Sequence, residues 1–436
     1  MPKHIYRAVS VEDVDREELI KRVRAEKRVV FGCDAAKDSW RGALMTPSCE
    51  VVCILSWDLQ QSHRVLDLLA ALRGAGVEVQ VVAEPTGTYA DAFAFQVRQA
   101  GLDMYMVSPK HTHDYAEIYD GVPSQHDSKD AVVVAKVHLE RRKPTRWPAL
   151  SEEQRELRAR CAHVDWLKQE YQRDQGRTEA LLARHWPELT RELDLDGASL
   201  PGLLAEFGSA QAVAAEPDRA RQLLGKLSRD LLGKDKLGRV LETAKHSLGQ
   251  PPTGSERQLL QELGRRMQDS RRQLRDAERA VMQVARDLPA MKLMRDCIGP
   301  MTTAIFLAFI GDPRQFSSAR TLFKLLGLNL RERSSGKFKG QLKISKRGNS
   351  VVRRWLYLAA LRLIKDDQIV RAWVDHKAQR SGGMKMKAII ALMRKLVSAL
   401  RHVANGSPFD SAKLFDVERL KRVRALPANF HAASAA

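Results

Sequence analysis

Short apolar runs alternate with amphipathic segments over the first third of this 436-residue chain. Short apolar runs between polar or glycine-rich segments are typical of strands, and apolar positions three and four apart are typical of helices. The pattern predicts strands at 28–34, 40–45 and 50–57, a helix at 61–76, a strand at 77–85, a helix at 88–101, a strand at 103–109 and a helix at 127–140. Helices between strands imply parallel crossovers, so residues 27–150 are predicted to form an α/β domain, with a polar loop before the last helix.

A helical pattern follows over residues 151–290. Ser151 with Gln154, and Ser255 with Gln258, have the spacing of a capping box at a helix start. After the second box, seam positions recur three and four residues apart, at Leu260, Leu263, Met267, Ser270, Leu274, Ala277, Val281, Val284 and Leu288. A seam of this kind predicts a coiled coil roughly 45 Å long. Because lone coiled coils commonly join subunits, we expect a homo-oligomer.

The last region, residues 291–415, is predicted to be mainly helical around a basic loop, and residues 416–436 are predicted to be a flexible tail. The segment from Cys297 to Ala304 resembles a helix-hairpin-helix, in which a glycine turn directs backbone N–H groups at a DNA phosphate. Cys297 stands where a second glycine is usual, which favours packing of this hairpin over close DNA contact.

The charge of the chain indicates a polyanionic partner. Lys and Arg number 73 against 53 Asp and Glu, so the formal net charge is +20 and the pI is about 9.9. Between Arg314 and Arg354 the chain carries twelve Lys or Arg and a single acid, Glu332. A run of charge is usually a solvated surface, but a one-signed run interleaved with Gly and Ser favours contacts with the phosphates of DNA or RNA.

Other features exclude several protein classes. No apolar run approaches the roughly 18 to 20 residues of a membrane helix, and the polar start resembles neither a secretory signal nor a transit peptide. Five cysteines without C-x-x-C spacing argue against a disulfide framework and against a zinc site. We therefore expect a cytoplasmic, nucleoid-associated protein.

Four acids in the first region are candidate metal ligands. Asp34 and Glu84 end two predicted strands, and Asp127 and Asp130 stand three apart at the start of a predicted helix. Parallel sheets place ligand sites beyond the carboxyl ends of their strands, so these acids are expected to meet at one edge. Close carboxylates repel one another unless cations lie between them, and hard oxygen ligands suit Mg²⁺ or Mn²⁺. Taken singly, such an acid is more often structural: Asp34 as the cap of a turn, Glu84 as the partner of a surface Lys and Asp127 as a helix cap.

The residues around these acids resemble a known family. The runs GCDAAKDS, AEPTGTY and HDSKDA are similar to the three acidic motifs of the DEDD transposases of insertion sequence family 110. Residues 297–360, which include RSSGKFKG, are similar to the C-terminal transposase domain of that family. The resemblance covers most of residues 27–410. It implies an RNase H-like (RuvC-like) α/β N-terminal domain, a helical coiled-coil middle and a mainly α C-terminal domain.

The resemblance also implies a chemistry. Asp34, Glu84, Asp127 and Asp130 fall on the metal-binding acids of the family, and Ser335 falls on its nucleophilic serine. Ser335 is preferred to its neighbour Ser334 because the serine of the family directly precedes a glycine. By itself a Ser before a Gly is usually only turn chemistry, but cations that favour a developing negative charge surround this one. They are expected to bind nucleic acid, and they are Arg331, Arg333, Lys337, Lys339, Lys343, Lys346 and Arg347.

These features together predict a transposase or recombinase that cuts and rejoins DNA. The family resemblance implies a covalent serine–DNA intermediate and guidance by a structured RNA, the bridge RNA. Three alternatives stay open. One is a metal-dependent RuvC-like endonuclease, such as a junction resolvase, that uses the four acids and a water nucleophile. The others are a site-specific DNA invertase and a non-catalytic nucleic-acid-binding scaffold.

Overall fold

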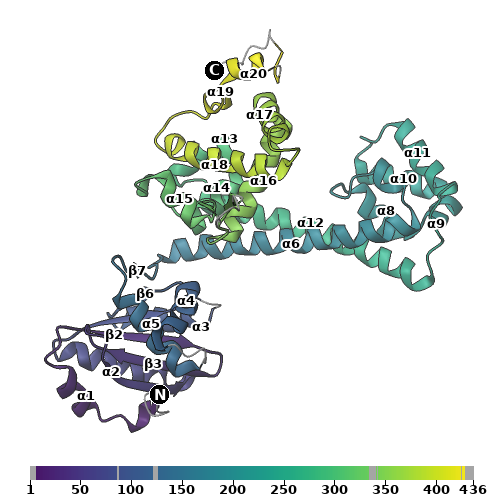
Figure 1. Ribbon diagram of the computed structural model, residues 1–436. Coiled ribbons are helices and arrows are strands. Elements are labelled where there is room, and N and C mark those ends of the chain that lie inside the picture. The colour runs from purple at the N-terminus through teal and green to yellow at the C-terminus, as the bar shows by residue number, and fades with distance from the viewer. Residues whose placement is uncertain are drawn as a thin grey trace. The chain divides into compact units, whose positions relative to one another are not determined.

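The computed structural model describes residues 6–85, 88–120, 126–332, 340, 342–423 and 425–427 (Figure 1). The chain divides into two compact units, Met1–Ala149 and Leu150–Ala436. The first unit is mixed α/β, and the second is almost entirely helical.

A seven-stranded mixed sheet organises the first unit. Its strand order is β1-β4-β3-β2-β5-β6-β7, with β1 at Val9–Ser10, β2 at Arg28–Ala35, β3 at Ser39–Met45, β4 at Val51–Asp58, β5 at Glu78–Ala83, β6 at Asp103–Met106 and β7 at Thr145–Arg146. Strands β2, β5 and β6 are parallel, and β3 runs antiparallel to both β2 and β4. An antiparallel meander continued by parallel crossover strands is consistent with the RNase H-like domain that the family resemblance implies.

Helices cover both faces of this sheet (Figure 1). On one face, Phe31 of β2 shares a core with Leu69 of α2 (Ser62–Gly74) and Phe93 of α3 (Tyr89–Gln99), and α1 (Arg16–Val23) joins the same core. On the other face, Val82 of β5 packs with Val134 of α5 (Asp127–Leu139). The apolar run of β2 therefore serves two cores, one on each side.

The predicted strands and helices of this unit are present, but the predicted polar loop is largely a helix, α4 (Pro109–Asp120). Pro109 occupies its first position, where the missing N–H would have no intrahelical partner in any case. Thr112 and Ala116, four residues apart, are buried. With so few apolar residues in the segment, the helical period was not visible in the sequence. The pattern also missed α1 and β1.

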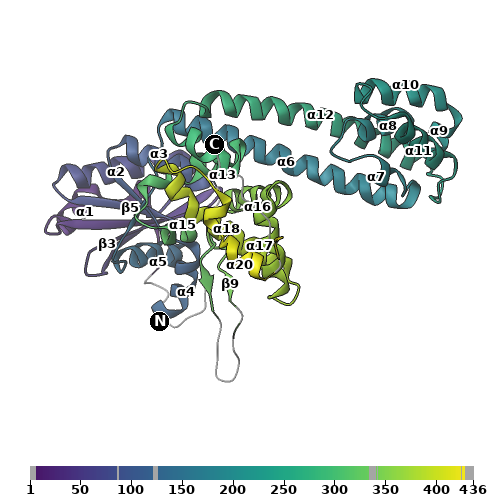
Figure 2. The ribbon, with the colours of Figure 1, turned by 90° about the horizontal axis from the view of Figure 1, so that it is seen from above.

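Two long helices form the axis of the second unit, α6 (Glu152–His185) and α12 (Gly254–Ala285), and they lie side by side (Figures 1 and 2). The capping box of Ser151 and Gln154 opens α6 as predicted. The box that opens α12 is Thr253 with Glu256, two residues before the predicted pair. The Glu256 carboxylate accepts from the Thr253 N–H at 2.9 Å, a contact that favours this register over the neighbouring one.

The predicted coiled coil is not confirmed. Seam residues such as Met267 and Leu274 are buried, but α12 packs against α6 and α8 (Ser199–Phe207) of its own chain. Gly264 lies so close to α8 that a Cβ there would be 2.5 Å from the backbone nitrogen of Ala205. The seam is thus filled within the chain and gives no support to an oligomer. Around α8, a separate core is completed by α7 (Leu189–Glu192), α9 (Ala210–Ala215), α10 (Pro217–Ser228) and α11 (Lys234–Lys245).

The C-terminal part of the second unit is built on the other end of the long helices. Its elements are α13 (Pro289–Ile298), α14 (Pro300–Phe309), α15 (Ala319–Leu325), β8 (Leu330–Arg331), β9 (Lys343–Ile344), α16 (Ser350–Asp366), α17 (Gln368–Gln379), α18 (Lys385–Ala404), α19 (Ser411–Leu414) and α20 (Val417–Arg422). A single core contains Leu157 of α6, Val281 of α12, Phe306 of α14 and Leu396 of α18. In the segment predicted as a tail, α20 contributes Leu420 to this core.

A buried carboxylate ties α6 to α16 within this core. Asp165 is 5% exposed, and it accepts hydrogen bonds from Arg354 Nε at 3.1 Å and from the Trp355 indole at 2.8 Å. A second Arg354 nitrogen contacts the other carboxylate oxygen of Asp165, so the pair is bidentate. The contact fixes the register of two helices that are nearly 200 residues apart in the sequence.

Candidate active site

Two of the candidate acids end neighbouring parallel strands. Asp34 is the next-to-last residue of β2, and Glu84 directly follows β5. The ladder pairs Cys33 with Ala83, so its continuation places Asp34 beside Glu84. Strands are about 4.8 Å apart in a sheet, and in-register residues of parallel strands point to the same side. The two carboxylates therefore leave the sheet next to each other.

Both carboxylates face helix α5. Side chains alternate between the two faces of a sheet. Cys33 and Ala83 belong to the core on the α2 and α3 side, so Asp34 and Glu84, one residue further on, are on the opposite side.

Gly32 brings α5 close to this strand end. A Cβ at Gly32 would lie 2.4 Å from the carbonyl oxygen of Ala131 and 2.5 Å from the backbone nitrogen of Ala135. The helix therefore rests directly on the backbone of β2, two residues before Asp34. Ala131 directly follows Asp130, so the same contact sets the first turn of α5 against the strand-end acids.

The other two acids occupy that first turn. The cap of α5 is His126, whose Nδ1 lies 3.3 Å from the Lys129 N–H, so Asp127 is the first helical residue and not the cap. Acids in a first turn are favoured by the helix dipole. Asp127 and Asp130, three apart, lie on adjacent positions of one side.

Electrostatic coupling shows that the four acids lie close to one another. The pKa of Asp34 is raised to about 6, first by burial and then by the carboxylates of Asp130, Asp127 and Glu84, against the opposing effect of Arg41. The pKa of Asp130 is also raised, first by burial and then by Asp127. The negative charge of neighbouring carboxylates thus disfavours ionisation of Asp34, Glu84 and Asp130.

Glu84 has a partner that the sequence did not reveal. The hydroxyl of Thr112, a buried residue of α4, donates to Glu84 Oε1 and also lies 2.9 Å from the carbonyl oxygen of Pro109. Burial raises the pKa of Glu84, and the Thr112 hydrogen bond partly opposes this. Thr112 thus positions the Glu84 carboxylate. No pattern in the polar segment around it pointed to this role.

The carboxylates are near one another without converging on a point. Among the residues that the structure describes, no three His, Cys, Asp or Glu side chains are placed to share one metal ion. The donors available at this edge are carboxylate oxygens, three of them on partly buried residues, and this chemistry suits a hard divalent cation.

Comparison with known proteins agrees with this geometry. Residues 31–187 match a family model described as "Transposase", for the DEDD transposases of IS110, and residues 295–374 match one described as "Transposase IS116/IS110/IS902 family". An uncharacterised 43.6 kDa protein of insertion element IS110 from Streptomyces coelicolor is 24% identical over 397 residues, which are 88% of this chain and 96% of that protein.

The chain belongs to the IS110 family of DEDD transposases. It is accordingly an enzyme that cuts and rejoins DNA, and DNA is its substrate. Membership of the DEDD class also implies dependence on a divalent metal ion. Along the described residues, no helix combines the length and the apolar character that a membrane span requires.

The segment of this transposase that carries the candidate serine lies partly outside the described residues. Ser334, Ser335, Arg333, Lys337 and Lys339 all fall there. The described residues on either side form a short antiparallel ladder, in which Arg331 of β8 pairs with Lys343 of β9.

Two further candidate cations of the transposase, Lys346 and Arg347, follow β9. Lys346 has a φ of 56°, in the left-handed region that residues other than glycine seldom adopt. Its backbone N–H donates to the carbonyl oxygen of Gly327 at 2.9 Å, and a Cβ at Gly327 would lie 2.7 Å from the Lys346 carbonyl carbon. Close packing of two loops thus holds Lys346 in its unusual conformation.

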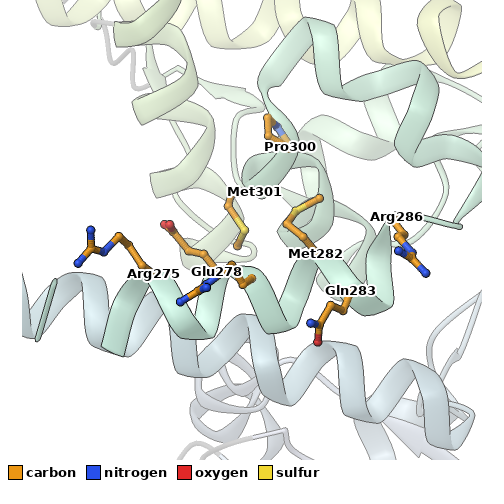
Figure 3. Close-up of a pocket in the computed structure, with 8 residues that line it drawn as sticks. Arg275, Glu278, Met282, Gln283, Arg286, Pro300 and Met301 are labelled. Carbon is orange, nitrogen blue, oxygen red and sulfur yellow. The ribbon is translucent and has the colours of Figure 1, made fainter. Parts of the chain in front are cut away.

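The predicted hairpin of the transposase at Cys297–Ala304 is present as α13, Gly299 and α14. Gly299 has a φ of 83°, and Cys297 is fully buried in the core, in agreement with a packing role for that residue. An open hollow of about 850 Å³ lies between the first turn of α14 and one side of α12 (Figure 3). Its lining mixes Met282 and Met301 with the charged side chains of Arg275, Glu278, Arg279 and Arg286.

Proposed function

We propose that this transposase breaks and rejoins DNA strands with a metal site and a serine nucleophile. The carboxylates of Asp34, Glu84, Asp127 and Asp130 would hold Mg²⁺ or Mn²⁺, and the hydroxyl of Ser335 would attack the DNA backbone. The observation that carries the metal half is the placement of Asp34 and Glu84 at neighbouring strand ends, on the face where Gly32 lets the first turn of α5, with Asp127 and Asp130, pack against the sheet. The serine half rests on the family match to residues 295–374, which include Ser335.

The proposed reaction conserves phosphodiester bonds. A divalent ion would offset the negative charge that gathers on the phosphate under attack. Ser335 Oγ gives up its proton and bonds to phosphorus, while the bond from phosphorus to one backbone oxygen breaks and that oxygen leaves as a protonated strand end. The hydroxyl of another strand end then attacks the serine-linked phosphorus and releases Ser335. No outside energy source is needed, because the energy of the broken phosphodiester bond is kept in the covalent serine–DNA bond.

The basic residues around the serine would hold the DNA backbone during these steps. Positive groups in this position stabilise the charge that develops on the phosphate oxygens. The set comprises Arg331, Arg333, Lys337, Lys339, Lys343, Lys346 and Arg347.

The family resemblance adds a guide and an assembly to the proposal. A structured bridge RNA would direct the choice of DNA, and the enzyme would work as a dimer or tetramer in which the acids of one chain meet the serine of another. Sequencing of the RNA that co-purifies with the protein tests the guide. A discrete RNA with defined ends, matching DNA beside the gene, is the expected result, and random cellular RNA would count against it.

Two variants test the chemistry. Ser335→Ala should abolish the covalent protein–DNA adducts that a denaturing gel detects, whereas Ser334→Ala should keep them. Adducts that survive in Ser335→Ala would show the serine assignment to be wrong, and free cutting without adducts would favour a water nucleophile. Asp34→Asn should abolish cleavage together with its metal dependence, and unchanged cleavage would refute the metal site.

A further inference from the structure

The base of the β8–β9 hairpin borders a groove with an unusual lining. The groove has a volume of about 930 Å³ and lies between the two short strands and the helices α17 and α18. Six of the side chains that line it are cationic and unpaired with any carboxylate of the described residues: Arg331, Lys343, Lys346, Lys377, Lys387 and Arg394. No acid among the described residues lines it. A concave surface of one sign concentrates a polyanion.

A seventh cation, Lys395, has a different role. Its Nζ donates to the carbonyl oxygen of Leu414 at 2.9 Å and lies over the rings of Trp373 and Phe415. Because its charge is already satisfied by protein groups, Lys395 holds the wall of the groove together. The six other cations are the ones available to a ligand.

Apolar side chains share the groove with these cations. Leu330, Leu342 and Met384 line it and are 46%, 57% and 45% exposed. Large apolar side chains so exposed within one basic groove favour a ligand with both charged and apolar parts. An unpaired polynucleotide has both, because its phosphates are charged and its bases are free to leave the stack. A duplex offers mainly phosphates to a groove of this size.

One cation of the groove is backed by an aromatic ring. The guanidinium of Arg394 lies 4.7 Å from the centroid of the Phe323 ring, and its Nη1 is buried without a hydrogen-bond partner among the described residues. Planar Arg groups backed by an aromatic ring are surfaces on which unpaired bases stack. An N–H donor left without a partner is favoured to acquire one from a ligand.

From these observations we propose that the groove between the β8–β9 hairpin and α17–α18 binds an unpaired nucleic-acid strand, with phosphates on its cations and bases against Leu330, Leu342 and Arg394. The inference rests on the proposed function, because the same hairpin leads into the segment that carries Ser335. It adds that the hairpin base holds a single strand, and it assigns this role to Lys377, Lys387 and Arg394.

The test measures binding of a fluorescent single strand of about twelve nucleotides, a length within the range that one such site accommodates. It uses the full-length Ser335→Ala protein, freed of RNA and without divalent metal. Binding in this background is independent of the acids and of the serine, so failure of the proposed chemistry leaves the result unaffected. Oligothymidylate and oligouridylate distinguish a DNA strand from an RNA strand, and a duplex of the same length is the comparison.

Matched variants locate the site. Lys387→Gln should weaken single-strand binding about fivefold to tenfold and lower the salt slope by about 0.7, as expected when one phosphate contact is lost. Lys385→Gln, also exposed on α18 but outside the groove lining, should change neither. Leu342→Ser should weaken a strand with bases more than an abasic strand of the same length.

Lys346→Gly protects the test against a folding artefact. Glycine adopts the left-handed conformation of this position without strain, so thermal stability should stay level or rise while binding weakens. The proposal is overturned if Lys387→Gln and Lys385→Gln behave alike. It is also overturned if duplexes bind as tightly as single strands, or if polyglutamate displaces the strand as readily as an unlabelled oligonucleotide does.

Discussion

The contact of Gly32 with α5 allows a sharp test of how the acidic site is assembled. Gly32→Ala adds one methyl group 2.4 Å from the Ala131 carbonyl oxygen, where ordinary contact begins at 3.4 Å. The helix must therefore move by 3.4 − 2.4 = 1.0 Å, because the nearest atoms, the Ala131 carbonyl oxygen and the Ala135 nitrogen, belong to its backbone and cannot rotate away. Overpacking of this kind typically costs about 1 to 3 kcal/mol. A displacement of 1 Å at a reacting site typically lowers the rate on the order of a hundredfold.

The expected result is a folded enzyme in which two of the four acids are displaced from the other two. Asp127 and Asp130 move with α5, whereas Asp34 and Glu84 stay with the sheet. The DNA strand-cleavage rate of Gly32→Ala should fall on the order of a hundredfold, and the Mg²⁺ concentration for half-maximal cleavage should rise. Thermal unfolding of the full-length protein measures the stability change, and a metal titration of cleavage measures the site.

The matched control is Gly42→Ala, in the neighbouring strand. Its Cβ would lie 2.1 Å from the Phe31 ring, which belongs to the core on the α2 and α3 face. It should destabilise the same unit and leave the metal requirement unchanged. The reasoning is refuted if Gly32→Ala keeps the metal requirement of the wild type, or if Gly42→Ala shifts it equally.

Three other predictions follow from buried polar groups. Asp165→Ala leaves Arg354 without its buried partner and should lower the free energy of unfolding by about 3 kcal/mol in thermal or denaturant unfolding. Thr112→Val removes the donor to Glu84 and should raise the Mg²⁺ concentration needed for cleavage. His138 is 2% exposed, and burial, with Arg28 and Arg141, lowers its pKa to about 4. As the pH falls below about 6.5, this histidine is therefore protonated in the unfolded chain but still neutral in the folded one. Stability should thus decrease from pH 7 downward, by at most about 2 kcal/mol from this group at pH 5.

Each of these predictions has a control. Asp276→Ala breaks an exposed ion pair with Arg279 on α12 and should cost under about 0.5 kcal/mol, so an equal loss would contradict the role given to Asp165. Thr112→Ser keeps the hydroxyl and should behave as the wild type. His138→Gln should flatten the pH dependence, and a variant with the slope of the wild type would exclude His138 as its source.

The sequence predicted the strand-end acids because strand ends are visible as the limits of apolar runs. Asp34 and Glu84 follow such runs, and parallel pairing of the strands was enough to bring them to one edge. Gly32 carried a weaker signal. A glycine inside an apolar strand indicates that another backbone approaches closely, but it does not identify the segment that does so. Only the packing of α5 supplied that partner.

Other features depended on contacts that no local pattern records. Thr112 is one polar residue in a polar segment, and its link to Glu84 spans 28 positions of the chain. The seam of α12 was visible in the sequence. A heptad pattern does not show, however, whether the seam packs against another subunit or against another helix of the same chain. The partners proved to be α6 and α8 of the same chain. The competing caps Thr253 and Ser255 have the same spacing, and only the side-chain contacts distinguish them.

The common core of α6, α12 and the C-terminal helices bears on how the protein can be divided. The match to the first family model runs to residue 187 and so includes α6, yet α6 folds with the second unit. A fragment cut at the end of that match would expose Leu157, Cys161 and Val164, which are buried in the whole chain. A chimaera that takes the α/β unit with the four acids from a relative should therefore be joined near residue 149, ahead of α6. A junction there transfers the acids together and leaves the core of the second unit intact.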